Sequence, residues 1–411
     1  MTDSAAHPAL FPMPRACPYD PPPELARLQR QAPVSQVRIW NGSTPWLLTR
    51  YDDVRAALAD PRVSADPRRP GYPHTSSGAA AQQQRTRMFI EMDDPEHAAQ
   101  RRLVAGDFTL KRMRALWPRI QQLTDELLDA LLEGPNPTDL VAAFALPLPL
   151  LVICELLGVP YGDRDFLKES STAMVSHSST PDQVLAATDD MLTYLGELTR
   201  EKCQSPTDDL LSRLAVEQLR PGLLDAEQIA SLGQLLLVAG HETTANMIAL
   251  GTLALLERPE QFARIGNSDT PQAAAGAVEE LLRYFSVLHS GRRLVALTDL
   301  EIGGQCISSG QGIIAALDIA NRDQTVFPNA DTLDLDRDAR RHLAFGHGVH
   351  QCLGQSLTRI ELQIAYHTLA RRIPTLTLAA DAQDLQFRED TIALGVCELP
   401  VSWQDSNLSC P

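Results

Sequence analysis

The sequence predicts a mainly α-helical fold with smaller β regions, and three observations lead to this class. First, apolar residues recur every three or four positions over most of residues 53–380, for example in 120–132 and 353–372. Second, signals for β-strands gather in short intervals near the two ends of the chain. Third, the 411 residues contain no internal repeat and no linker-like segment that divides them. We therefore expect a single domain over residues 26–411.

The N-terminal elements follow from local signals. Residues 1–25 are rich in proline, and we expect them to form an extended arm. Residues 34–40 and 46–50 predict a hairpin, because Asn41-Gly42 favours a tight turn between two strands.

A second β-rich interval spans residues 294–319. Its turn signals are Gly303-Gly304 and Ser309-Gly310. The last strand candidates lie in residues 392–399. The helical pattern between these β regions therefore carries most of the predicted core.

Charge and cysteine content limit the class of protein. The formal net charge is −16, which argues against nucleic acid or an anionic membrane as the main partner. The N-terminus has no basic-then-apolar leader. Seven cysteines are scattered without a CxxC pair, a pattern that fits a reducing compartment better than a disulfide framework. We expect a cytoplasmic protein.

Residues 229–256 form a long apolar segment with one formal charge, Glu242. Its length would suffice to cross a bilayer. However, the charge sits near its middle with polar neighbours, which is costly in hydrocarbon. A helix buried through the centre of a large domain is the better interpretation.

The polar cluster in this helix has two interpretations. The hydroxyl of Thr243 is expected to bond the carbonyl of Ala239, and Gly240 would let another group approach the backbone, so the helix would be bent and locally opened. Glu242 beside Thr243 then places an acid and an alcohol in a dry core, as proton delivery to a buried reaction requires. The alternative is a satisfied polar pocket in a structural helix, and these residues alone do not decide between the two.

The stretch of residues 345–354 surrounds Cys352 with glycines and histidines. It is not a dinucleotide fingerprint, because Gln351 stands where the third glycine is needed. A catalytic nucleophile is weakly supported, because Cys–His pairs usually come from distant segments. A metal or haem ligand fits more of the residues: the start of a helix near Leu353 would stabilise a thiolate, and the glycines would let the loop lie against a flat ligand.

This stretch resembles the haem-binding signature of the cytochrome P-450 superfamily, Phe345-x-x-Gly348-x-His350-x-Cys352-x-Gly354. Further segments resemble other motifs of this superfamily in the same order along the chain. They are the oxygen-activation segment Ala239-Gly240-x-Glu242-Thr243-Thr244, the ExxR pair Glu280-Leu-Leu-Arg283 and the haem-propionate segment Asp94-Pro95-Glu96-His97-x-x-x-Arg101.

The resemblance implies a haem b cofactor (iron protoporphyrin IX) between the long central helix and the cysteine loop, with Cys352 as the axial thiolate. Cofactor contacts are expected from His97, Arg101, Ala239, Gly240, Arg293, Phe345, Gly346, His350, Cys352 and Gly354. Thr243 and Glu242 would be catalytic, with Thr243 hydrogen-bonding dioxygen or a nearby water and Glu242 relaying protons. Glu280 and Arg283 would form a buried structural lock. Weaker substrate contacts are expected from Met88, Leu236, Val238, Val287, Leu288, His289, Ile392 and Ala393.

One position departs from the pattern of the superfamily. Its usual propionate-binding arginine falls at Leu294 in this chain, five residues before Asp299. Arg293 would reach the haem propionates only if the strand holds a bulge, and Arg292 is the other candidate for this contact.

The implied function is a haem-thiolate monooxygenase of the bacterial, soluble, natural-product or xenobiotic hydroxylase branch. It would hydroxylate or epoxidise a bulky, largely apolar substrate such as a macrolide, polyene or terpenoid, using O2 and electrons from a ferredoxin and its reductase. The ferredoxin would dock on a basic patch containing Arg340, Arg341 and His342, with Arg101, Arg102 and Arg359 nearby. The alternatives are a nitric oxide reductase-like enzyme that uses NADH directly, and a non-catalytic haem sensor.

Overall fold

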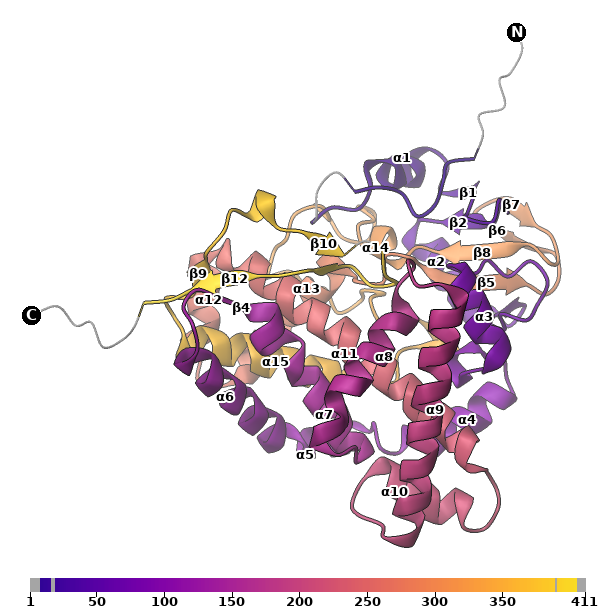
Figure 1. The fold of residues 1–411 in the computed structure, drawn as a ribbon. Coiled ribbons are helices and arrows are strands. Elements are labelled where there is room, and N and C mark those ends of the chain that lie inside the picture. The colour runs from indigo at the N-terminus through magenta and orange to yellow at the C-terminus, as the bar shows by residue number, and fades with distance from the viewer. Residues whose placement is uncertain (1–7, 16–18, 389, 405–411) are drawn as a thin grey trace, which may run out of the picture.

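The computed structural model describes residues 8–15, 19–388 and 390–404, and helices make up most of it (Figure 1). The α-helices are α1 (Pro23–Gln31), α2 (Tyr51–Ala59), α3 (Ser77–Arg85), α4 (Glu96–Ala105), α5 (Leu110–Ala115), α6 (Trp117–Glu133), α7 (Pro147–Leu157), α8 (Arg164–Val175), α9 (Pro181–Gln204), α10 (Leu210–Leu214), α11 (Ala226–Leu256), α12 (Pro259–Gly266), α13 (Ala275–Phe285), α14 (Leu317–Ala320) and α15 (Gln355–Arg372). The strands are β1 (Val34–Gln36), β2 (Trp46–Leu48), β3 (Val63–Ser64), β4 (Thr138–Asp139), β5 (Arg292–Ala296), β6 (Leu300–Ile302), β7 (Gln305–Ile307), β8 (Gly312–Ala315), β9 (Thr377–Leu378), β10 (Phe387–Arg388), β11 (Gly395–Val396) and β12 (Pro400–Ser402). The mainly α class with smaller β regions is confirmed.

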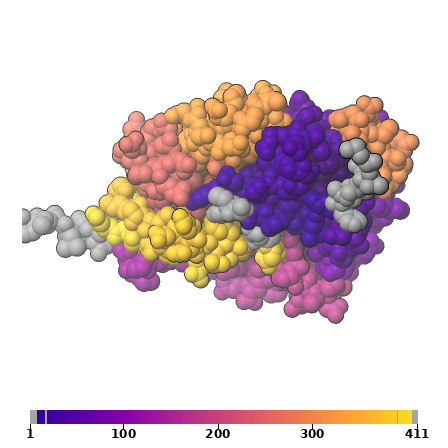
Figure 2. Space-filling model, turned by 90° about the horizontal axis from the view of Figure 1, so that it is seen from above, coloured from indigo at the N-terminus to yellow at the C-terminus, as the bar shows by residue number. Residues whose placement is uncertain are grey.

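The largest sheet joins the N-terminal strands to strands far along the chain. Its order is β1-β2-β8-β5-β3. The predicted hairpin is present as the antiparallel pair β1 and β2, with Val34 opposite Leu48. The strand β2 runs parallel to β8, and β5 pairs antiparallel with both β8 and β3. Viewed from above, the indigo N-terminal part of the chain accordingly lies against the orange segments (Figure 2).

The two faces of this sheet contact different apolar clusters, because successive side chains of a strand alternate between faces. On β5 and β8, Leu294 and Ala315 belong to the cluster that includes α2. Ile314 belongs instead to the cluster that contains Phe11 from the N-terminal segment. Residue parity on β5 therefore decides which side of the sheet a side chain reaches.

The central helix α11 packs against α7, α9 and α15 inside the largest apolar cluster. It begins three residues before the predicted start, where the Asp225 side chain and Gln228 form a reciprocal cap. The expected hydrogen bond from Thr243 Oγ1 to the Ala239 carbonyl is present at 2.9 Å. The helix is nevertheless an uninterrupted α-helix through this segment, so the expected local opening does not appear.

The N-terminal segment packs along the sheet. The Phe11 N–H donates to the Arg38 carbonyl at 2.8 Å, and the Phe11 side chain is 2% exposed. Residues 1–7 and 16–18 of the predicted arm lie outside the described residues. The helix α1 begins at Pro23, inside the predicted arm, because proline suits the first turn of a helix. In the described part of the chain, no helix combines the length and the apolar character that a membrane span needs.

Candidate functional site

Cys352 lies in a loop that backbone hydrogen bonds shape closely. Its own N–H donates to the Phe345 carbonyl at 2.8 Å, and the Gly346 N–H donates to Leu343 at 2.8 Å. Gly346 and Gly348 have φ of +69° and +73°, a conformation that glycine adopts without the penalty of a side chain. The predicted stretch is thus a folded loop whose shape depends on these glycines.

The glycines of the loop differ in what surrounds them. A side chain at Gly348 would place its Cβ 2.4 Å from the Leu58 carbonyl oxygen, so this glycine allows the loop to contact α2. The approach of this glycine to a cofactor stays a prediction. At Gly354 the added Cβ would lie 4.0 Å from Cys352 Sγ, next to the predicted ligand. At Gly240 on α11 it would lie 3.2 Å from the Ile153 side chain, so this glycine serves the packing of α7.

The sulfur of Cys352 lies just before α15, which begins at Gln355 rather than near Leu353. Burial raises the pKa of the Cys352 thiol. The backbone N–H groups of Gly354 and Gln355 and the charges of Arg101 and Arg359 act in the opposite direction. The expected thiolate-stabilising groups are therefore present, and they compete with desolvation.

Two histidines and Arg101 meet beside the cysteine loop. The His97 and His350 rings lie 4.1 Å apart between centroids. His97 is 2% exposed and its Nδ1 lies 3.1 Å from Asp94, yet its Nε2 and the Nδ1 of His350 are buried without a hydrogen-bond partner. The Arg101 side chain donates to the Gln351 carbonyl at 2.7 Å, which places it next to the cysteine.

The charges in this cluster disfavour one another. Burial and the charges of Arg292, His97 and Arg101 lower the pKa of His350 to about 3. Burial also lowers the pKa of Arg101. Burying cationic side chains and polar atoms without hydrogen-bond partners costs free energy. An anionic ligand would lower that cost, because it would supply both the opposite charge and the missing acceptors.

Arg292 belongs to this cluster and Arg293 does not. Arg293 is buried on the opposite face of β5, where it donates to the Ser290 and Pro73 carbonyls and lies over the Phe11 ring. This arrangement contradicts the prediction that Arg293 contacts the cofactor. Arg292 donates to the Ile90 carbonyl, and its charge acts on His350. It shares a strand face with Leu294, the position where the superfamily usually has its arginine.

The α11 helix presents one accessible patch in an otherwise buried middle. Between Leu232 and Leu255, the residues that retain accessible surface are Val238, Ala239, Gly240 and Thr243. Thr244 lies 3.4 Å from Thr358 on α15, hydroxyl to hydroxyl, which ties this part of α11 to the first turn after the cysteine loop. The predicted residues Ala239 and Thr243 are therefore one turn apart on the face that is not packed.

Glu242 points away from this patch. It is 6% exposed, and its Oε1 accepts a hydrogen bond from the exposed Thr172 of α8 at 3.3 Å. The Arg388 guanidinium of β10 lies 4.0 Å from its Oε2. The predicted acid and alcohol are therefore neighbours whose side chains diverge, with the acid directed toward α8 and β10.

Glu280 and Arg283 form a fully buried pair behind the loop. Two hydrogen bonds of 2.7 and 2.8 Å join the guanidinium to the carboxylate, and both side chains are 0% exposed. Arg283 also donates to the carbonyls of Asn321, Ala330 and Thr332. This contact network joins α13 to the segment that leads into the cysteine loop.

The predicted substrate residues fall into segments that partly meet. The Leu394 N–H donates to the Val287 carbonyl at 2.8 Å, and His289 Nε2 lies 2.7 Å from the Thr391 carbonyl. These bonds bring Val287, Leu288 and His289 beside Ile392 and Ala393. Met88, Leu236 and Val238 come from the start of the 3-10 turn Phe89–Glu91 and from α11.

Several residues of the predicted basic patch are already paired or buried. His342 is 8% exposed, and both His342 and Arg359 contact Glu279. Arg340 pairs with Asp338, and Arg101 points inward. The predicted patch around Arg340–His342 is therefore wrong as a continuous cationic surface.

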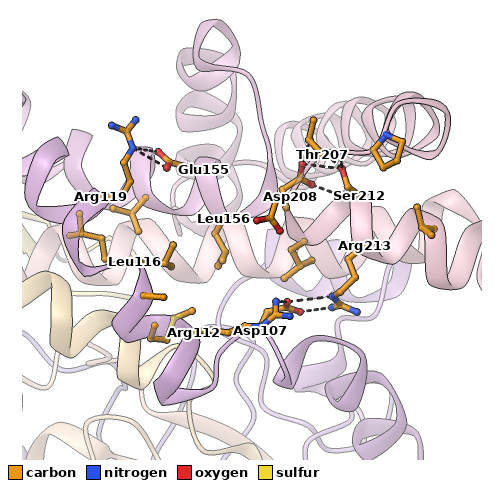
Figure 3. A pocket seen from close by; sticks show the side chains of 18 of the residues that line it. Asp107, Arg112, Leu116, Arg119, Glu155, Leu156, Thr207, Asp208, Ser212 and Arg213 are labelled. Carbon is orange, nitrogen blue, oxygen red and sulfur yellow. Dashed lines mark hydrogen bonds and ion pairs between the residues drawn. The ribbon is translucent and has the colours of Figure 1, made fainter.

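A cavity of about 760 Å³ lies elsewhere, between the start of α6 and the α10 region (Figure 3). It contains none of the predicted site residues. Its charged side chains pair with one another, as Arg119 does with Glu155 and Arg213 with Asp107.

Comparison with known proteins identifies the group to which this geometry belongs. Residues 274–392, which include the ExxR pair and the cysteine loop, match the family described as Cytochrome P450. "Cytochrome P450 GfsF" of Streptomyces halstedii is 51% identical over 397 residues, covering 96% of each chain. The chain belongs to the cytochrome P450 family. "Pentalenic acid synthase" of Streptomyces avermitilis is 45% identical over 400 residues, with 97% of this chain and 98% of that protein covered.

Solved structures agree with this assignment. The crystal structure of a mycinamicin VIII C21 methyl hydroxylase from Micromonospora griseorubida, bound to mycinamicin VIII, superposes with a TM-score of 0.91 at 37% identity, covering 96% of this chain and 100% of that chain. The protein is thus a P450 monooxygenase, and its family is a haem-thiolate family that uses redox partners and O2 with organic substrates. The residues present fit such a group, because a propionate-bearing ligand would supply partners for the buried His97 and His350 nitrogens. Among the described residues no cluster of three His, Cys, Asp or Glu side chains could hold a metal without such a ligand.

Sequence reasoning named Arg292 only as the alternative to Arg293, although Arg292 shares a strand face with Leu294. It missed Thr172, Arg388 and Glu279, because their contacts join segments that are far apart in sequence.

Proposed function

We propose that this P450 monooxygenase binds haem b through Cys352 and hydroxylates or epoxidises a bulky, largely apolar natural product or xenobiotic. One observation carries the cofactor assignment: the buried nitrogens of His97 and His350 lack partners beside Arg101, Arg292 and the cysteine loop. Haem bound through a thiolate supplies an iron centre whose electron density favours O–O cleavage. His97, Arg101, Arg292 and His350 would hold its propionates.

Proton supply is proposed to run through Glu242. Its carboxylate contacts the exposed Thr172 hydroxyl on one side, and Thr243 follows it on the open patch of α11. A buried carboxylate in contact with an exposed hydroxyl is suited to taking up protons from that side, one residue from the patch that Thr243 faces. Thr243, whose hydroxyl donates to Ala239, would orient a water or dioxygen there.

The substrate proposal rests on the residues predicted to contact the substrate and on the compounds that two similar proteins are named for. The segments around Val287–His289 and Ile392–Ala393 are mostly apolar and lie together. The similar hydroxylase above was solved with mycinamicin VIII, and another relative is named for pentalenic acid. A macrolide or terpenoid of comparable bulk is therefore the substrate class to test first.

We propose that a ferredoxin docks beside the cysteine loop at a smaller surface than the sequence suggested. Val349 is 57% exposed, three residues before Cys352. Arg55 of α2 acts on His347, and Arg55 and Arg102 are exposed. An apolar centre with cationic neighbours suits an acidic partner. Arg55→Glu should raise the KM for ferredoxin several-fold, and Arg30→Glu on α1 should leave it unchanged.

The cofactor and substrate proposals have a direct test. The reduced protein with carbon monoxide should show the red-shifted Soret band of thiolate ligation, and Cys352→Ala should lose it. An unshifted band in the wild type would exclude the ligand assignment. A spin-shift screen of macrolides, terpenoids and xenobiotics should then identify binders, and failure of every bulky apolar compound would contradict the substrate class.

A further inference from the structure

A second buried network contacts the cysteine loop from α13 and α15. Arg359 of α15 forms two hydrogen bonds with Glu279 of α13, at 2.6 and 3.0 Å. The Nε2 of His342 lies 3.2 Å from Oε2 of the same carboxylate. The Arg359 guanidinium also lies 4.6 Å from the centre of the Phe345 ring. Three elements are therefore joined at the start of the loop.

The charges in this network can be assigned from its hydrogen bonds. The Ala344 N–H donates to His342 Nδ1 at 3.1 Å, so this nitrogen is the acceptor and carries no proton. The Nε2 of His342 lies near Glu279 without forming a hydrogen bond to it. Burial raises the pKa of Glu279, but His342 and Arg359 outweigh it and hold the pKa at about 2. The network therefore consists of an ionised carboxylate, a cation and a neutral imidazole.

The network reaches Cys352 by two routes. The first is through contacts: the Phe345 carbonyl accepts the Cys352 N–H at 2.8 Å, and the Phe345 ring contacts both Arg359 and His342. The second is electrostatic, since the charges of Arg359 and Arg101 both act on the Cys352 sulfur. Arg101 is placed to be neutralised by a propionate. The Arg359 side chain is 27% exposed, so its charge is only partly screened.

We propose that Arg359 is a positioning residue that sets the electrostatic potential at Cys352, and that Glu279 and His342 hold it there and balance its charge. This proposal rests on the proposed haem-thiolate function. One-electron reduction adds a negative charge at the cofactor. A cation beside the thiolate therefore favours the reduced protein, and the Glu279 carboxylate opposes it.

Two substitutions that break the same ion pair should act in opposite directions. Arg359→Gln removes the cation and leaves Glu279 ionised, so the reduction equilibrium against a mediator dye should shift at least about threefold toward the oxidised protein. Glu279→Gln leaves Arg359 unbalanced and should shift this equilibrium by a similar factor toward the reduced protein. A network that only supports the loop would move both variants the same way, because both lose the same bridge.

Matched variants separate charge from packing. Arg359→Lys keeps the charge and loses the two-pronged contact, so it should stay within about twofold of the wild-type equilibrium even if its stability falls. His342→Gln changes no charge and should behave likewise. Arg340→Gln removes a neighbouring cation that is 78% exposed and paired with Asp338, and should have no effect. If Arg359→Gln fails to fold, the other two variants still test the proposal: Glu279→Gln should shift the equilibrium toward the reduced protein, and Arg359→Lys should stay close to the wild type.

The outcomes also separate this proposal from the proposed function. A wild-type protein without the red-shifted carbon monoxide band would overturn both. A normal wild-type band with shifts of the same sign in Arg359→Gln and Glu279→Gln, or with no shift in either, would overturn only the role of the network. Opposite shifts with an unaffected Arg340→Gln are the expected result.

Discussion

Replacing Arg283 with methionine should destabilise the protein severely. The substitution leaves the Glu280 carboxylate in a site that is 0% exposed, and removing one partner of a buried ion pair costs about 3–5 kcal/mol. The carbonyls of Asn321 and Ala330 lose donors at 2.8 and 2.9 Å, which adds about 1 kcal/mol each. Arg337 and the Asp334 N–H still contact Glu280, so part of its charge stays compensated. We expect a net loss of at least about 4 kcal/mol, a large fraction of the roughly 5–15 kcal/mol that stabilises a typical folded protein.

The assay is urea unfolding followed by far-ultraviolet circular dichroism, with the haem content of the purified protein as a second measurement. Arg340→Met is the matched control, because its pair with Asp338 is exposed to solvent and should contribute little to stability. The double variant Glu280→Leu, Arg283→Met should recover part of the loss, because it leaves no uncompensated charge at these two positions. If Arg283→Met unfolds within about 1 kcal/mol of the wild type, the interpretation of this pair as a structural lock is refuted.

Three further predictions concern the site and its surroundings. Thr243→Ala should uncouple electron consumption from product formation and release peroxide while substrate binding is retained; unchanged coupling would count against its role. Gly348→Ala should lower the free energy of unfolding by at least about 1–3 kcal/mol, since φ is +73° and the new Cβ would meet the Leu58 carbonyl, whereas Gly304→Ala, strained but in open space, should cost less. Burial is the main cause that lowers the pKa of His289 from 6.5 to about 4. The unfolded chain therefore binds more protons in this window, and stability should fall by up to about 3 kcal/mol as the pH drops from 6.5 to 4. His289→Gln should make that dependence shallower, and an unchanged pH profile would contradict the assignment.

Much of the fold could be predicted because its signals are local. The apolar run of α11, the Asn41-Gly42 turn and the period of α15 each lie within one segment, and each appears close to its expected place. The glycine-rich spacing around Cys352 likewise belongs to one stretch of chain. Such patterns specify an element without reference to its neighbours.

The errors concern facts that depend on distant partners. Arg292 and Arg293 are adjacent, and only the register of β5 against β8 decides that Arg293 turns toward Phe11. Arg359 and His342 were expected on a docking surface, but Glu279, which precedes Arg359 by 80 residues, binds both. No periodicity reports such a pairing, because it is fixed by tertiary packing.

The main sheet also constrains how the chain can fold during its synthesis. Its N-terminal strands β2 and β3 complete their pairing only with β8 and β5, respectively. At translation rates of about 5–20 residues per second, the roughly 250 intervening residues take about 10–50 s to appear. During that time the β2 edge is exposed as an unpaired strand, a surface that other chains can join. Slower growth or an available chaperone should therefore raise the yield of folded protein.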